Sequence, residues 1–151
     1  MNWKNLLSTD KDNLSALIIR LTVEIVLFPH GAQKLFGWFG GYGLSGTMGY
    51  LTNTQHLPWI LSLLVILIEA IGSLALIAGF ATRFFAFGIL AEFIGIIFTV
   101  HLKFGFFMNW NALPNTSEGF EYHLLILGLA AALLITGGGK WSVDSKLFKR
   151  Q

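Results

Sequence analysis

The sequence predicts an all-α membrane protein, built as an antiparallel bundle of four transmembrane helices with both termini in the cytoplasm. The first observation behind this prediction is composition, because only 12% of the 151 residues are charged and 54% are hydrophobic. Soluble domains carry about 25% charged residues, and disordered chains combine low hydrophobicity with high charge. The mean hydropathy of +0.66 therefore favours a chain that lies in a membrane.

Four long apolar segments are the second observation. A helix needs about 20 mostly apolar residues to cross the hydrocarbon core of a bilayer, and the segments lie at about 14–36, 58–80, 84–107 and 120–136. The polar N-terminal segment has no short apolar stretch ahead of a cleavage site, so it does not resemble a signal peptide. We therefore expect the first helix to be retained and residues 1–151 to form one transmembrane domain.

The third observation is where the basic residues fall. Four spans place both termini and the loop between the second and third helices on one side of the membrane. That side holds Lys4, Lys11, Arg83, Lys140, Lys146, Lys149 and Arg150. The opposite loops, at 37–57 and 108–119, contain neither Lys nor Arg. Because cytoplasmic loops carry the excess of basic residues, this pattern predicts a multi-pass membrane protein with both termini in the cytoplasm, in contact with the lipid bilayer.

Several classes of function are disfavoured by the residues themselves. The chain has no cysteine, which excludes disulfides, thiolate metal sites, iron–sulfur clusters and cysteine nucleophiles. A net charge of +2, without a basic patch among the aromatics, argues against nucleic acid as a partner. The histidines and carboxylates form neither a His-x-x-x-His nor a Glu-x-x-His pair. We therefore predict no metal site.

Three glutamates inside the spans are the candidate catalytic residues. Counted at about 1.5 Å per residue, Glu24, Glu69 and Glu92 lie about 14–16 Å deep, near the middle of a hydrocarbon core about 30 Å thick. Ionisable residues at this depth are costly and usually face the bundle interior or a cavity. They could pass protons. The alternative is that they only form hydrogen bonds to neighbouring helices in their protonated form.

A second layer of polar residues is predicted in the outer third of the spans. We hypothesise that five side chains line one cavity there and bind a polar headgroup: His30, Lys34, His101, Glu121 and His123. Arg20 lies one turn from Glu24 and could pair with it, either as part of the site or as a structural ion pair. On a straight helix His101 is about 180° from Glu92, so a common cavity needs a bend. Otherwise these residues are interfacial anchors.

Four segments of the chain resemble one protein family. They are HGAQKLFGWFGGYG from His30, EAIGSLALIAGFATR from Glu69, EYHLLIL from Glu121 and GGGKWSVD from Gly137. The first of these is similar to the signature of the DoxX family, and the resemblance spans nearly the whole chain. It implies a four-helix protein of the inner membrane. It also implies a link to membrane redox chemistry, including thiosulfate–quinone oxidation and assemblies with soluble oxidoreductases.

Two functions of different classes follow. The first is a redox subunit that binds a quinone near the outer face, with the basic and histidine side chains as donors, the glutamates as proton carriers and Phe36, Trp38 or Tyr122 stacking on the ring. Electrons would then come from a partner oxidoreductase. The second is a non-enzymatic membrane scaffold, or a protein that binds a lipid or another small apolar ligand. The small size of the chain favours a homodimer or a complex with another protein in either case.

Overall fold

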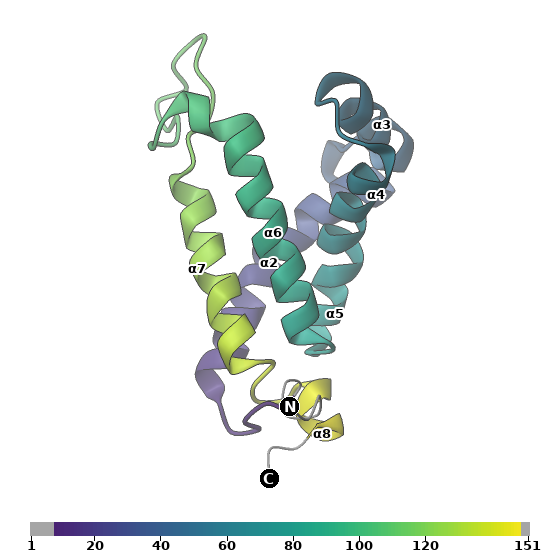
Figure 1. Ribbon diagram of the computed structural model, residues 1–151, viewed down its shortest axis with the longest axis vertical. Coiled ribbons are helices and arrows are strands. Elements are labelled where there is room, and N and C mark those ends of the chain that lie inside the picture. The colour runs from purple at the N-terminus through teal and green to yellow at the C-terminus, as the bar shows by residue number, and fades with distance from the viewer. Residues whose placement is uncertain (1–7, 149–151) are drawn as a thin grey trace.

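The computed structural model describes residues 8–148, in which four apolar helices pack side by side (Figure 1). Three are long and apolar enough to cross a membrane, namely Leu14–Phe36, Trp59–Ala78 and Thr82–Phe104. The fourth, Glu121–Thr136, is apolar but has only 16 residues. The protein is therefore an all-helical membrane protein with three long apolar helices and one shorter one.

The first long helix is α2 (Leu14–Phe36), and the other two are interrupted by segments of different winding. The second comprises α4 (Trp59–Leu67), the π-helical η3 (Ile68–Gly72) and α5 (Ser73–Ala78). The third comprises α6 (Thr82–Ile96), the π-helical η4 (Ile97–His101) and the 3₁₀ turn η5 (Leu102–Phe104). The short fourth helix is α7 (Glu121–Thr136).

Shorter elements lie at the two ends of the bundle (Figure 1). We call one end the loop end, because it carries η1 (Trp38–Gly40), α3 (Gly43–Gly49), η2 (Tyr50–Thr54) and the loop 105–119. The other is the tail end, where α2 begins and α8 (Val143–Leu147) lies. Local chemistry sets the limits of α2. The Asn13 side chain accepts a hydrogen bond from the Ala16 amide at 3.0 Å, and Gly37 ends the helix in a left-handed conformation (φ 74°).

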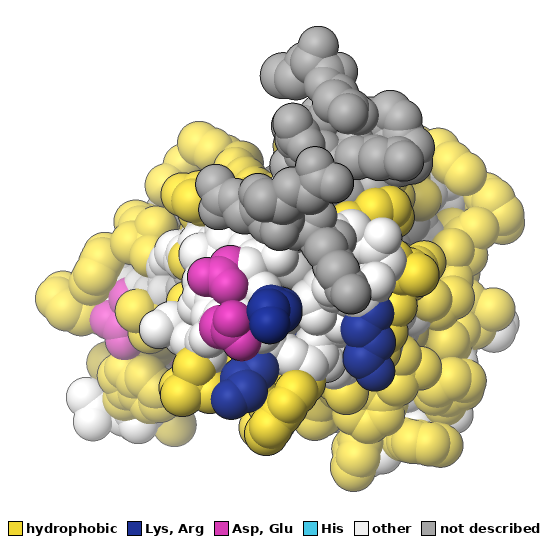
Figure 2. All heavy atoms as spheres, turned by 90° about the horizontal axis from the view of Figure 1, so that it is seen from below, with side chains coloured by type: hydrophobic (Ala, Val, Ile, Leu, Met, Phe, Trp, Pro, Cys, Tyr) yellow, Lys and Arg dark blue, Asp and Glu magenta, His cyan; other side chains and the backbone are white. Residues whose placement is uncertain are grey.

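The core is built from all four helices. It is lined by seven buried apolar side chains: Val23, Leu27, Leu76, Ile89, Phe93, Ile126 and Ala130. Many larger apolar side chains are exposed around the outside, including Ile25, Phe87 and Leu125. Seen from the tail end, apolar side chains form most of the periphery and the charged ones gather nearer the middle (Figure 2). Such an outward apolar surface fits contact with a lipid bilayer.

Two arginines bind main-chain carbonyl groups at the tail end. Arg20, which is buried, donates to the carbonyls of Leu76 (2.9 Å), Ile77 (2.8 Å) and Lys140 (3.2 Å). The last carbonyls of a helix have no partner within the helix, so Arg20 satisfies the end of α5. It also connects α5 to the segment that leads into α8.

Arg83 binds the main-chain carbonyls at the C-terminal end of α7 in the same way. It donates to the carbonyls of Leu134 (2.8 Å) and Ile135 (2.9 Å), and also to the carbonyl of Ser8 (2.9 Å). A cation at the C-terminus of a helix is further favoured by the helix dipole. Together the two arginines join the ends of α5 and α7 to the segments before α2 and after α7.

The carboxylate of Asp144 caps the start of α6. It accepts hydrogen bonds from the amides of Ala81 and Thr82, both at 2.8 Å. We expect Asp144→Ala to lower the free energy of unfolding by about 2 kcal/mol, because one buried and one partly buried amide lose their acceptor and the helix N-terminus loses a negative charge. Unfolding in mixed micelles with increasing SDS measures this. The exposed Asp12→Ala is the matched control, and equal unfolding of the two variants would contradict a capping role.

Candidate functional site

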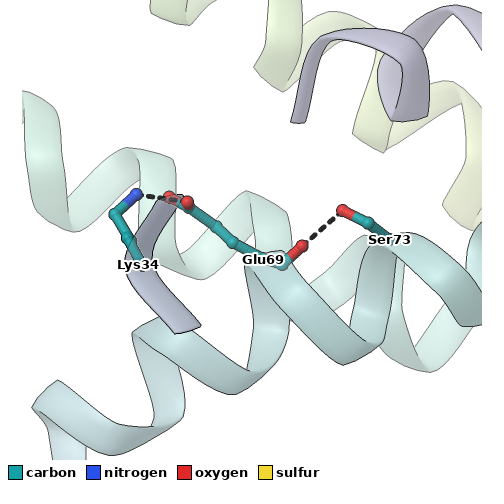
Figure 3. Close-up of polar contacts among 3 residues, drawn as sticks. All are labelled: Lys34, Glu69 and Ser73. Carbon is teal, nitrogen blue, oxygen red and sulfur yellow. Dashed lines mark hydrogen bonds and ion pairs between the residues drawn. The ribbon is translucent and has the colours of Figure 1, made fainter. Parts of the chain in front are cut away.

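A partly buried ion pair joins the first two apolar helices. The ammonium of Lys34 on α2 contacts a carboxylate oxygen of Glu69 on η3, and the two side chains point toward each other (Figure 3). The Glu69 side chain is 4% exposed and that of Lys34 is 28% exposed. A carboxylate this deeply buried needs a cation or hydrogen bonds to be stable, and Lys34 supplies both.

The backbone around Glu69 is unusual. Glu69 lies in the π-helical segment Ile68–Gly72, and such segments often occur at functional sites. The hydroxyl of Ser73 donates to the main-chain carbonyl of Glu69 (Figure 3). Gly31 of α2 packs directly on this segment, because a Cβ there would collide with the carbonyl of Glu69 and the amide nitrogen of Ala70. The absent side chain of Gly31 thus lets α2 approach Glu69.

Glu92 and Tyr122 complete the arrangement from the other two helices. Glu92 of α6 is 8% exposed, and its electrostatic neighbours are Glu69 and Lys34. Tyr122 of α7 also interacts electrostatically with Glu69. We call Lys34, Glu69, Glu92 and Tyr122 the four-helix cluster, because each of the four apolar helices contributes one member.

Several polar atoms of this cluster are unsatisfied. Within residues 8–148, neither carboxyl oxygen of Glu92 nor the hydroxyl of Tyr122 has a hydrogen-bond partner, although all three atoms are buried. Buried polar atoms are nearly always hydrogen-bonded, to protein or to a bound molecule. The cluster thus offers acceptors, a hydroxyl and an ammonium group in the interior of a membrane bundle.

A pair of histidines lies toward the loop end. The rings of His101 and His123 are 4.2 Å apart between centroids, and Phe93 lies 5.6 Å from the ring of His123. The Nδ1 atom of His101 is 2.7 Å from the carbonyl oxygen of Glu118. The Nδ1 atom of His123 is buried and has no hydrogen-bond partner in the described chain.

The structure does not bring the five residues of the expected outer layer together. Lys34 belongs to the four-helix cluster, and His101 and His123 form their own pair. His30 is exposed, and Glu121 accepts a hydrogen bond from the indole of Trp110 at 2.8 Å. Among residues 8–148, the contacts of these five side chains therefore fall into separate groups.

The three expected glutamates also separate into two places. Glu69 and Glu92 interact within the four-helix cluster, whereas Glu24 is fully buried and interacts with Arg20 and Ser73 toward the tail end. Arg20 itself binds main-chain carbonyls, as described above, and is an electrostatic neighbour of Glu24. Within residues 8–148 there is no group of three or more His, Asp or Glu side chains arranged to hold a metal ion.

Sequence reasoning missed two contributors to the cluster. Tyr122 was expected only as an aromatic ring for stacking, and its unpartnered hydroxyl became evident from its position against Glu69. Gly31 carried no expected role, although it belongs to the His-Gly-x-x-Lys motif that also contains Lys34. The spacing of that motif was a usable signal, since residues three apart share one face of a helix.

Comparison with known proteins identifies the family. Residues 15–102 match the family model described as DoxX. The chain is also similar to the inner membrane protein YqjF of Escherichia coli (strain K12), with 31% identity over 139 residues that cover 92% of this chain and 96% of that protein. A search of the solved structures finds no match. These matches confirm the resemblance given by the sequence motifs, and the chain belongs to the DoxX family of multi-pass inner membrane proteins.

Proposed function

We propose that this protein is a DoxX-like membrane redox subunit that binds a quinone headgroup at the four-helix cluster and works with a partner oxidoreductase. All four apolar helices span the membrane as an antiparallel bundle, and both termini are cytoplasmic, in line with the placement of basic residues. The observation that carries the proposal is the set of unpartnered buried atoms on Glu92 and Tyr122 beside the Lys34–Glu69 pair.

The donor set fits a quinone. A quinone headgroup presents two carbonyl oxygens that accept hydrogen bonds, and Lys34 and Tyr122 each carry a donor. Bound quinone would take up two electrons and two protons to become the quinol, with the electrons supplied by the partner oxidoreductase. Glu69 and Glu92 would hold protons beside the oxygens that need them. The nearby apolar side chains of the core, including Phe93, suit the apolar part of the quinone.

The experiment is quinone retention by the purified protein in lipid nanodiscs. We expect wild type to retain decylubiquinone, and we expect Tyr122→Phe to weaken binding about tenfold, since one hydrogen bond to the ligand is lost. Glu92→Gln should still bind quinone, but its affinity for quinone should no longer depend on whether the side chain at position 92 carries a proton. Tyr42→Phe, which alters a tyrosine that is 83% exposed, is the matched control and should bind as wild type does.

Two results would contradict the proposal. One is a wild-type protein that retains no quinone although it is folded, and the other is equal binding by Tyr122→Phe and Tyr42→Phe. If the first result comes with a stable co-purifying protein, the alternative of a non-enzymatic scaffold is favoured. If it comes with a bound phospholipid or another apolar compound, a ligand-binding protein is favoured.

A further inference from the structure

A second polar group is buried between the four-helix cluster and the tail end. Glu24 is fully buried, and neither of its carboxyl oxygens has a hydrogen-bond partner in residues 8–148. The Nε atom of Arg20, one turn away on α2, is also buried and unpartnered. These three atoms include both a donor and acceptors. Polar atoms of this kind, grouped in a protein interior, are typically satisfied by internal water.

Glu24 interrupts an apolar region. The apolar core that α2 helps to form includes the buried side chains of Val23, Leu27, Leu76 and Ile89, none of which can carry a proton. Burying a carboxyl group among them costs free energy unless the group is neutral, paired or hydrated. A carboxyl group at such a position has either a structural or a chemical role, and the neighbours of Glu24 indicate which of the two roles it has.

The neighbours of Glu24 lead in two directions. On one side lies Ser73, whose hydroxyl donates to the main-chain carbonyl of Glu69 (Figure 3). Glu24 therefore lies close to the turn that carries Glu69 of the four-helix cluster. On the other side lies Arg20, which interacts with both Glu24 and Asp144. Asp144 belongs to α8 at the tail end. Glu24 thus has the cluster on one side, through Ser73 and Glu69, and the buried charged groups Arg20 and Asp144 of the tail end on the other.

We propose that Glu24 is a proton-carrying residue that connects the four-helix cluster with the tail end, through internal water bound between Glu24 and Arg20. The inference rests on the proposed function, in which quinone reduction at the cluster consumes protons. In the transfer step the O–H bond of the Glu24 carboxyl breaks, and its proton passes through water to the carboxylate of Glu92 or Glu69. Arg20 stabilises the carboxylate left behind. Glu24 then takes a new proton from water at the tail end, and no electron moves.

The test is infrared spectroscopy of the protein in nanodiscs, without any quinone. A protonated carboxyl has a C=O band that shifts when its proton is replaced by deuterium. We expect wild type to show such a band for Glu24, to lose it on deprotonation at high pH, and to shift it within minutes in D₂O. Glu24→Gln should lack this band, and Glu24→Asp should restore a titrating band at a shifted position. Glu118→Gln, at the loop end, is the matched control and should retain the wild-type band.

Three outcomes would overturn the inference. The first is the absence of a Glu24 band at every pH, because Glu24 is then a permanently ionised partner of Arg20. The second is a band that resists deuterium for hours, because the carboxyl is then isolated from water. The third is slower exchange at Glu24 in Glu92→Gln, because protons would then arrive from the cluster rather than from the tail end. The proposed function fails separately, through loss of decylubiquinone binding, which Glu24→Gln should leave unchanged.

Discussion

Replacing Lys34 with Met should lower the free energy of unfolding by about 3–5 kcal/mol, because it leaves the Glu69 carboxylate buried without its cation. Removing both charges together, in Lys34→Met/Glu69→Leu, should recover most of this loss, since apolar side chains of similar volume can replace a buried ion pair at little cost. Unfolding by SDS in mixed micelles measures both variants against wild type. Neither the single nor the double variant should retain decylubiquinone.

This double substitution separates a structural role from a binding role. A double variant that is stable but does not bind quinone assigns the Lys34–Glu69 pair to the ligand. A stable double variant that binds quinone like wild type would show that the pair serves only the fold, and the proposed site would then be wrong. A single Lys34→Met variant as stable as wild type would contradict the argument from burial.

Gly31→Ala should also have a large effect, with a loss of about 3 kcal/mol in the free energy of unfolding. Alanine favours a helix over glycine by up to about 1 kcal/mol, but the added Cβ would collide with backbone atoms of η3 at Glu69 and Ala70. Backbone cannot rotate away as a flexible side chain can, so the two helices must separate. That separation would also draw Glu69 away from Lys34 and weaken quinone binding.

Gly95→Ala is the matched control for this change. Gly95 lies on α6, and no atom outside its immediate neighbourhood would lie within 4 Å of an added Cβ. This substitution should leave stability unchanged or raise it by up to about 1 kcal/mol. If Gly31→Ala behaves in the same way, the close approach of α2 to Glu69 is not needed for the fold.

The sequence was sufficient for the helical membrane fold, because apolar length and charge placement are properties of the segments themselves. The first apolar run corresponds to α2, and the third reaches only Phe104, since Gly105 then breaks the helix (φ 82°). The hydrogen bonds that hold the tail end together could not be predicted from the sequence. The carbonyls that Arg20 and Arg83 bind are present in every helix, and only the packed bundle determines which arginine reaches which helix end.

The candidate site could be predicted only in part. Lys34, Glu69 and Glu92 stand out because ionisable residues are rare in apolar spans, but which of them meet depends on how each helix is rotated. The π-helical segments η3 and η4 hold more residues per turn than an α-helix. Residues within or after them, such as His101 at the end of η4, therefore point in directions that a constant 100° per residue does not give. Glu24 was grouped with the other glutamates by depth alone, and depth cannot show that its neighbours differ.

The short length of α7 has a consequence for the surrounding lipid. Sixteen residues at about 1.5 Å each give a helix of about 24 Å, whereas the hydrocarbon core of a typical bilayer is about 30 Å thick. Arg83 at one end of α7 and Trp110 at the other hold polar groups near the two ends of this shorter helix. A bilayer can meet such a mismatch by thinning locally, at a cost that grows with each ångström. Lipids with short acyl chains should therefore fit beside α7 better than beside α2. A change in membrane thickness should thus affect the side of the bundle formed by α7 more than the side formed by α2.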